Sequence, residues 1–336
     1  VVAAGSRAVL PPVPGIDSSK VYTNDNVMRM DELPARMVVI GGGVIAAEFS
    51  HVFSAFGTEV TQLNRSSRLL RGVDEEVVAR FEEAASKQWN IVKDASLSEI
   101  RENADGSVTV VAKRTTENGE ELLEIPADAV LVATGRRPNT DTLNAKNYFD
   151  VQDGGQLSVD KYQRVLYNGA PVPGVYALGD VSSSYQLKHV ANHEARVVQH
   201  NLSHPEDLRA SDHRYVPGAV FSNPQIAVVG MTEEQAREAA EREGFEITLK
   251  AQNFGDTAYG WAMEDKIGLC KLIARKDNGE LLGAHLVGEE SSVLIQPLLQ
   301  AMSFGMDART LARGQYWIHP ALTEIIENAL LGLEFD

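Results

Sequence analysis

Residues 37–49 read Met-Val-Val-Ile-Gly-Gly-Gly-Val-Ile-Ala-Ala-Glu-Phe, an apolar run that enters three glycines and continues as a second apolar segment. The run 37–41 has the length of a buried strand, and the residues after it predict a helix over 44–56 that Gly57 ends. A second strand is expected over 60–63. A strand, a helix and a strand in this order begin a βαβ unit, so the fold class is predicted to be α/β.

The glycine-rich segment matches the pattern G-x-G-x-x-A, which is typical of dinucleotide sites. Gly41 permits a tight turn, Gly43 lets the backbone approach a pyrophosphate, and Ala46 keeps the helix close to the sheet. The start of the helix adds free N–H groups and the positive end of the helix dipole. Because a strand, a helix and a second strand surround the glycines, we predict a dinucleotide site rather than a purely structural turn.

The end of the second strand indicates which dinucleotide binds. An NAD site places Asp or Glu there to hold the ribose 2′-OH, whereas this chain has Asn64 and Arg65, followed by Arg68 and Arg71. A carboxylate would repel a 2′-phosphate, but arginines bind one through charge-assisted hydrogen bonds. The segment therefore favours NADPH over NADH, and the alternative is a solvated loop that is basic by coincidence.

Composition narrows the classes of function. The net charge is −16, from 47 acidic and 31 basic residues, which argues against a nucleic-acid or anionic-membrane partner. No apolar run approaches the roughly 18 residues of a spanning helix. Cys270 is the only cysteine, which excludes an internal disulfide and favours a reducing, cytoplasmic location. It shares a strand face with Leu272 and Ala274, which predicts a buried structural thiol.

Other patterns predict further elements. An amphipathic helix starts at 74–76, and a three-stranded meander covers 97–126. A capping box from Thr232 to Gln235 opens a helix that ends before Gly244. The remaining expectations are strands at 129–133, 175–178, 267–274 and 281–287 and helices near 189–202, 291–304 and 321–332.

Three smaller motifs are candidates for chemistry. The strand 129–133 leads into Thr-Gly-Arg-Arg-Pro-Asn, which contains Gly135, and the strand 175–178 ends in Gly179-Asp180. Asp180 could accept hydrogen bonds from a sugar-like chain, although a Gly-Asp turn is common by itself. His189 and His193 are spaced as metal ligands on a helix, but no third ligand is evident and no metal is expected.

The last motif is His-Pro-Ala-Leu-Thr-Glu at residues 319–324. The spacing takes His319 from a pre-helical position to Glu324 in the first turn of a helix, where the carboxylate could orient the imidazole as an acid/base pair. The alternative is a histidine at a helix start beside a glutamate that the helix dipole favours.

Together these motifs resemble the pyridine nucleotide–disulfide oxidoreductases, the group of glutathione reductase and dihydrolipoamide dehydrogenase. The resemblance covers essentially the whole chain, and residues 315–333 resemble one branch of the family that uses NADPH. It implies a Rossmann-like NAD(P)-binding domain inserted in an FAD domain and followed by an α+β interface domain. The implied segments are 1–33 and 149–211 for the FAD domain, 34–148 for the NADPH-binding domain and 212–336 for the interface or dimerisation domain.

The resemblance also implies roles for single residues. His319 would exchange a proton with a thiolate in the active site of the partner subunit, and Glu324 would orient it, so the protein would be a homodimer with a shared active site. Asp180 would hold the ribityl chain of FAD, and the helix that begins near His189 would direct N–H groups at the flavin. Glu48 would pair with a lysine beside the flavin.

The implied activity is reduction of a low-molecular-weight disulfide by NADPH through FAD and a Cys-x-x-x-x-Cys disulfide. The 336 residues contain neither that cysteine pair nor a first FAD glycine motif. We therefore expect that the chain lacks the N-terminal part of an FAD domain and is inactive alone. The alternatives are another reductase of the family, of the glutathione, dihydrolipoamide or mercuric type, or a non-catalytic module that binds nucleotide and dimerises.

Overall fold

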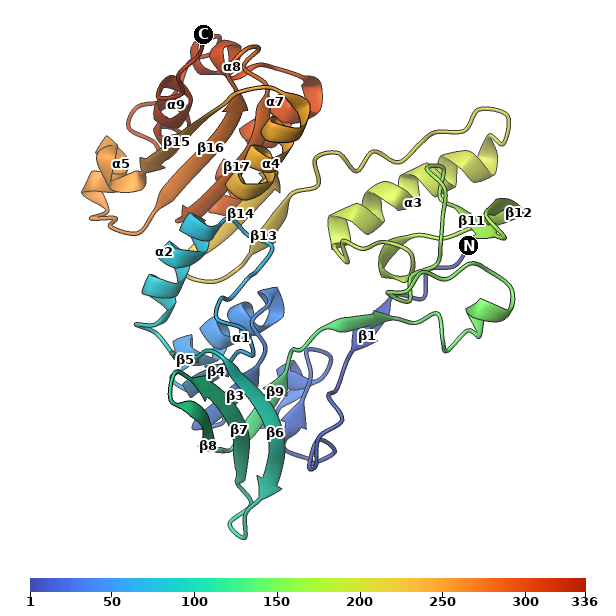
Figure 1. Cartoon of the computed structure of the whole chain (residues 1–336), viewed down its shortest axis with the longest axis vertical. Coiled ribbons are helices and arrows are strands. Elements are labelled where there is room, and N and C mark those ends of the chain that lie inside the picture. The colour runs from blue at the N-terminus through green and yellow to red at the C-terminus, as the bar shows by residue number, and fades with distance from the viewer. The chain divides into compact units, whose positions relative to one another are not determined.

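The computed structural model describes all residues, 1–336, and divides into two compact units (Figure 1). The smaller unit combines Val1–Leu10 with Thr134–Val216, and the larger unit combines Pro11–Ala133 with Pro217–Asp336. This division is coarser than the four segments expected from the sequence, whose borders stay a prediction. No helix is both long and apolar enough to cross a membrane.

A parallel five-stranded sheet forms the first half of the larger unit, with the strand order β2-β9-β3-β4-β5 (Figure 1). The expected βαβ start is confirmed, because β3, α1 and β4 follow one another and β3 pairs in parallel with β4. Its elements are β2 (Val21–Tyr22), β3 (Arg36–Ile40), α1 (Val44–Ala55), β4 (Glu59–Leu63), α2 (Glu75–Ala85), β5 (Asn90–Val92) and β9 (Ala129–Val132).

The strand β3 is buried on both faces, as its uninterrupted apolar sequence requires. Val39 packs with Phe81 of α2 on one face, while Val38 packs on the other face with the expected meander. That meander is an antiparallel sheet of β6 (Ala95–Glu102), β7 (Val108–Thr116) and β8 (Gly119–Ala127). The apolar run therefore fixes β3 at the centre of a layered unit, and the glycines emerge at its carboxyl end.

An antiparallel five-stranded sheet forms the second half of the larger unit, in the order β13-β14-β17-β16-β15. Its strands are β13 (Gly218–Val220), β14 (Gln225–Gly230), β15 (Ile247–Asn253), β16 (Leu269–Arg275) and β17 (Leu281–Gly288). Its helices are α4 (Glu233–Glu243), α5 (Ala258–Ala262), α6 (Ser291–Leu294), α7 (Gln296–Phe304), α8 (Ala308–Arg313) and α9 (Glu324–Leu331).

The helix boundaries follow local chemistry. The capping box of Thr232 and Gln235 is present, and Gly244 ends α4 in a left-handed conformation, as expected. The single helix expected over 291–304 is wrong, because two helices meet at Ile295. Pro297, in the first turn of α7, has no N–H to continue the hydrogen bonds of α6.

One buried cluster joins the two halves of the larger unit. Phe81 and Trp89 from the half that contains the parallel sheet, called the nucleotide-binding half after the predicted site, belong to the same cluster as Ile226, Leu269 and Val287 from the antiparallel sheet. The two halves therefore share a hydrophobic core.

The smaller unit has few strands and one long helix, α3 (Lys188–Ser203). Its pairs are β1 (Ser6–Ala8) with β10 (Arg136–Pro138) and β11 (Arg164–Tyr167) with β12 (Ala170–Tyr176), both antiparallel. The strand expected at 175–178 is thus the end of β12, after which Ala177 makes a single bridge to Val2. Short 3₁₀ helices lie at Ala145–Asn147 and Gly179–Val181 in this unit and at Val27–Arg29 and Phe254–Asp256 in the larger unit.

Candidate functional site

The glycine turn has the geometry of a dinucleotide site. Gly41 has φ +141°, and a Cβ there would lie 2.3 Å from the carbonyl oxygen of Ala133, so only glycine fits. A Cβ on Gly43 would meet nothing within 4 Å, and no side chain caps the first turn of α1. Ala46 is fully buried. The first N–H groups of α1 thus remain available to a phosphate, as the sequence pattern predicts.

The loop after β4 presents two of its three arginines. Arg65 and Arg71 are exposed, whereas the guanidinium of Arg68 donates to the carbonyl oxygens of Arg71 and Val73 at 3.0 and 2.9 Å. Arg68 therefore shapes the loop, and Arg65 and Arg71 are the cations left to meet a 2′-phosphate. Their contact with the cofactor stays a prediction.

Asn64 is buried, with 5% of its surface exposed. Its amide nitrogen donates to the carbonyl oxygens of Ser66 and Arg68 at 2.7 and 3.0 Å. The Asn64 side chain therefore stabilises the start of the loop by bonding the backbone of the loop. The absence of a carboxylate at position 64 still leaves the loop free of the group that would repel a 2′-phosphate.

Glu48 points from α1 toward the start of the antiparallel sheet. Its Oε1 accepts a hydrogen bond from the backbone N–H of Phe221 at 2.9 Å, and burial raises the pKa of Glu48 above its usual value. The implied lysine partner is not among these contacts, so that pairing stays a prediction.

In the smaller unit, Asp180 is held by the N-terminal strand. Its Oδ2 accepts from Ser6 Oγ at 2.7 Å, and Ser6 Oγ accepts in turn from Arg136 Nε at 2.8 Å. Gly135 lies beside this chain of contacts with φ +136° and open space where a Cβ would stand. The arrangement fits a polyhydroxyl chain, because Ser6 fixes the Asp180 carboxylate and Gly135 has no side chain to fill the space beside its backbone.

A buried carboxylate fixes the turn that carries Asp180. Glu194 of α3 is 2% exposed, and its Oε2 accepts from the N–H of Gly179 at 2.7 Å. His213 Nε2 lies 3.1 Å from the other oxygen. Sequence reasoning gave no role to Glu194 or Ser6, because a glutamate in a helix and a serine in a turn carry no signal by themselves. His189 lies in the first turn of α3, exposed, as expected.

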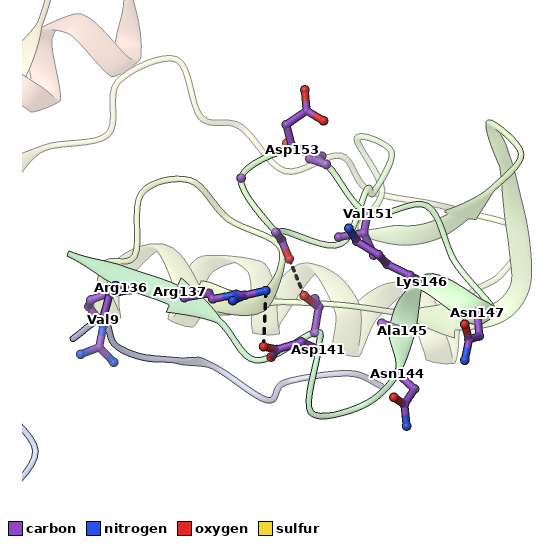
Figure 2. Close-up of a pocket in the computed structure, with 14 residues that line it drawn as sticks. Val9, Arg136, Arg137, Asp141, Asn144, Ala145, Lys146, Asn147, Val151 and Asp153 are labelled. Carbon is purple, nitrogen blue, oxygen red and sulfur yellow. Dashed lines mark hydrogen bonds and ion pairs between the residues drawn. The ribbon is translucent and has the colours of Figure 1, made fainter. Parts of the chain in front are cut away.

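The smaller unit also contains a polar cavity of about 500 Å³ (Figure 2). Arg137 points toward Asp141 across its wall, with Nη2 and Oδ2 3.5 Å apart. Arg7 also donates two hydrogen bonds to Asp141, and these hold the pKa of that carboxyl well below its usual range. Arg137, one of the cations of this wall, is therefore already paired with an anion.

The two residues of the predicted acid/base pair meet at the start of α9. His319 Nδ1 lies 2.7 Å from Oε1 of Glu324, the first residue of α9. The His319 side chain is 69% exposed, whereas that of Glu324 is 17% exposed. Because Glu324 occupies Nδ1, Nε2 is the ring nitrogen left for the predicted proton exchange.

Cys270 lies in β16 with no exposed surface. Burial raises the pKa of its thiol to about 12, so it stays protonated near neutral pH. The predicted structural thiol is confirmed.

The comparisons with known proteins agree with this geometry. Residues 1–195 match the family described as pyridine nucleotide-disulphide oxidoreductase, and residues 216–330 match the dimerisation domain of the same family. The chain belongs to this family, whose members use FAD and NAD(P)H. The resemblance inferred from the motifs and the predicted fold class are thereby confirmed.

Comparisons with individual members of the family show how similar the chain is to each of them. The chain is 51% identical to mycothione reductase of Mycobacterium tuberculosis, over 99% of this chain and 70% of that protein. It is 33% identical to dihydrolipoyl dehydrogenase of Synechocystis, over 97% of this chain and 68% of the relative. The HOCl-induced flavoprotein disulfide reductase of Escherichia coli superposes with a TM-score of 0.85 at 28% identity, covering 98% of this chain and 72% of that structure.

Proposed function

We propose that the chain belongs to an FAD-dependent reductase that uses NADPH to convert mycothione to mycothiol. The proposal is supported chiefly by the 51% identity to the mycobacterial mycothione reductase. Residues 315–333, which contain the acid/base pair, carry the same likeness. A cytoplasmic location belongs to the same proposal.

The overall reaction consumes one NADPH, one proton and one disulfide, and yields NADP⁺ and two thiols. FAD, when bound, carries the electron pair from the nicotinamide to a redox-active cysteine pair. Gly135 and Asp180 would hold the ribityl end of FAD, and the first turn of α3 would direct its N–H groups at the flavin. Cys270 is buried and alone, so it does not fit the role of a redox-active pair.

In this proposal His319 moves the proton. Its Nε2 would protonate the departing thiolate of the substrate and take the proton back from an active-site thiol, while Glu324 keeps the ring oriented through Nδ1. The high exposure of His319 in a single chain and the matched dimerisation domain support a homodimer in which this pair faces the partner's cysteines.

NADPH would bind along the turn at Gly41 and Gly43, with its 2′-phosphate between Arg65 and Arg71. The substitution Arg65→Glu tests this, because it replaces a phosphate ligand by a group that repels phosphate. We expect the KM for NADPH to rise by about tenfold or more, with the KM for NADH changed less than about twofold. Equal changes for both nucleotides would refute the 2′-phosphate site.

The substrate is tested by steady-state kinetics of the FAD-loaded holoenzyme with four electron acceptors: mycothione, glutathione disulfide, lipoamide and Hg²⁺. The proposal expects kcat/KM for mycothione to exceed each of the others by at least about a hundredfold, as differential transition-state binding allows. A preference for any of the other three would replace mycothione reduction with the corresponding activity of the family.

A further inference from the structure

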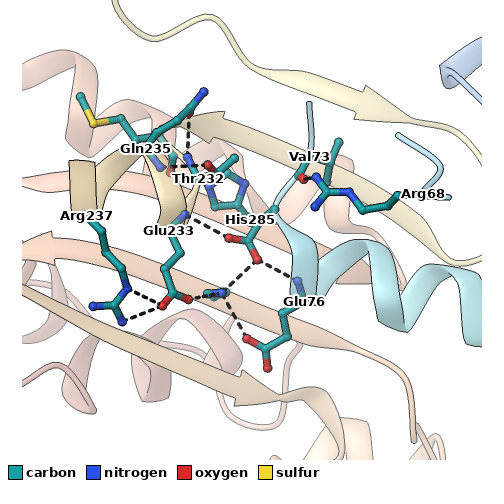
Figure 3. Close-up of polar contacts among 11 residues, drawn as sticks. Arg68, Val73, Glu76, Thr232, Glu233, Gln235, Arg237 and His285 are labelled. Atoms are coloured by element: carbon teal, nitrogen blue, oxygen red, sulfur yellow. Dashed lines mark hydrogen bonds and ion pairs between the residues drawn. The ribbon is translucent and has the colours of Figure 1, made fainter. Parts of the chain in front are cut away.

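A buried lysine lies where the nucleotide-binding half of the larger unit meets the antiparallel sheet. Lys271 is in β16, and its side chain is 6% exposed. Its Nζ lies 3.0 Å from Asp74 Oδ1, 3.3 Å from Glu76 Oε2 and 2.6 Å from Glu233 Oε2. Glu76 and Glu233 reach this junction from α2 and α4 (Figure 3). A buried cation is stable only with such partners, so the cluster is a single interdependent unit.

Asp74 is the centre of the cluster and caps two helices. Its Oδ1 accepts from the N–H of Glu76 at the start of α2, and its Oδ2 accepts from the N–H of Glu233 at the start of α4. Lys271 donates to Oδ1 as well, at 3.0 Å. The position of Asp74 is therefore set from both halves of the larger unit at once.

Few cations compensate the three carboxylates. Arg237 reaches only Glu233, through two hydrogen bonds of 2.8 and 2.6 Å. His285 pairs with Lys271 across β16 and β17, but burial lowers its pKa, and its Nε2 bonds the carbonyl oxygen of Met231. Loss of Lys271 would leave Asp74 buried against two carboxylates, and their repulsion would displace it.

The arginine loop ends directly at Asp74. Arg71 lies three residues before it, and the Arg68 guanidinium bonds the carbonyl oxygens of Arg71 and Val73. The N–H of Leu70 also donates to the carbonyl oxygen of Gly42 at 2.7 Å, which ties the loop to the glycine turn. A shift of Asp74 would therefore pass through residues 71–73 to the loop that presents Arg71.

The loop and the cluster also border the same space. Arg68, Arg71 and Lys271 all line one cavity of about 680 Å³ in the larger unit, together with the first turns of α2 and α4.

We propose that Lys271 is a positioning residue for nucleotide selectivity. By holding Asp74 in place, it fixes the end of the loop that presents Arg71 to the 2′-phosphate. This inference rests on the proposed use of NADPH. NADH has no phosphate at that position, so its binding does not depend on Lys271.

The test compares two ligands that differ only in the 2′-phosphate, 2′,5′-ADP and 5′-AMP, by calorimetric titration of the FAD-loaded holoenzyme. Lys271→Met should weaken 2′,5′-ADP by about tenfold, since one charge-assisted phosphate contact is misaligned, and should change 5′-AMP by less than about twofold. Lys276→Met is the matched control, because Lys276 pairs with the exposed Glu246 and the charge change is identical. It should leave both ligands unchanged.

The outcomes distinguish a failure of the proposed NADPH site from a failure of the proposed role of Lys271. If the unaltered chain does not prefer 2′,5′-ADP, the proposed NADPH site fails and this inference falls with it. If the unaltered chain does prefer it, but Lys271→Met weakens both ligands equally or neither, Lys271 is only a structural tie and the inference is overturned. Should Lys271→Met not fold, Asp74→Asn serves instead, because asparagine keeps one acceptor oxygen for a helix N–H but lacks the charge that anchors Lys271. It should weaken 2′,5′-ADP several-fold and leave 5′-AMP unchanged; equal effects on both ligands would overturn the inference.

Discussion

The turn between β3 and α1 and the pair before α9 are built in opposite ways. At the turn, backbone N–H groups make the site, and Gly41 is required because there is no room for a Cβ. At the pair, two side chains make the site, and His319 is largely exposed. In the proposed function, the site made of backbone is complete in a single chain, whereas the exposed imidazole would meet its reacting partner on another subunit. A substitution at one of the two sites should therefore leave the other site unchanged.

The substitution Gly41→Val should have the largest effect. Its Cβ would overlap the carbonyl oxygen of Ala133, and φ +141° excludes a β-branched residue, so the turn must move. We expect calorimetry to detect no binding of either 2′,5′-ADP or 5′-AMP. Gly57→Ala is the control for backbone strain, because φ is +94° there and a Cβ meets nothing within 4 Å. Binding that survives Gly41→Val would contradict a site made of backbone.

At the side-chain site, His319→Gln should lower kcat of the holoenzyme by about 10² to 10⁴, the range for loss of a general acid/base. Nucleotide binding should not change, since the turn at Gly41 does not involve His319. Glu324→Gln should cause a smaller loss, because the imidazole remains in place but is held less firmly. Stopped-flow turnover and calorimetry check both parts, and a parallel loss of nucleotide affinity would show that the sites are not independent.

A smaller effect is expected from acid, and it concerns the junction between the halves. Burial alone would raise the pKa of Asp74, but hydrogen bonds from the Glu233 N–H and from Lys271 bring it below the usual 3.8. Its stabilising contribution is therefore present above pH 3.8 and is lost as the pH falls through the lowered value. Urea unfolding of Asp74→Asn should show a shallower loss of stability below pH 3.8 than the unaltered chain. Identical slopes would remove Asp74 from the acid response.

The smallest effect should come from Cys270. Its pKa of about 12 and its complete burial predict no reaction with iodoacetamide at pH 8 in the folded chain and full reaction in denaturant. Mass spectrometry counts the modified thiol. Rapid labelling of the folded chain would mean that β16 opens readily. It would contradict the prediction that Cys270 is inaccessible in the folded state.

Local sequence patterns predicted the glycine turn at Gly41 more completely than they predicted the pair of His319 and Glu324. The apolar run before Gly41 and the capping box at Thr232 predict their elements because the decisive residues are neighbours in the chain. The pairing of β1 with β10 joins residues about 130 positions apart, and neither strand has a strong pattern. The family resemblance supplied the roles of His319 and Asp180, which spacing alone left open.

The burial of charged residues could not be predicted from the sequence, because it depends on long-range packing. In the sequence, Glu194 and Lys271 look like charged residues of a solvent-exposed surface. Only the fold shows that both are buried. The acidic start of α2 was predicted, but its link to Lys271 depends on a strand almost 200 residues later.

The core shared by Phe81, Trp89, Ile226, Leu269 and Val287 limits how this protein can be recombined. A chimaera that exchanged only the nucleotide-binding segment with a relative would pair half of one core with half of another. Mismatched volumes at that seam would leave voids or overlaps, each of which destabilises a packed interior. Transplanting cofactor preference between members of the family is therefore better attempted in the loop of Arg65 and Arg71 than by exchange of whole domains.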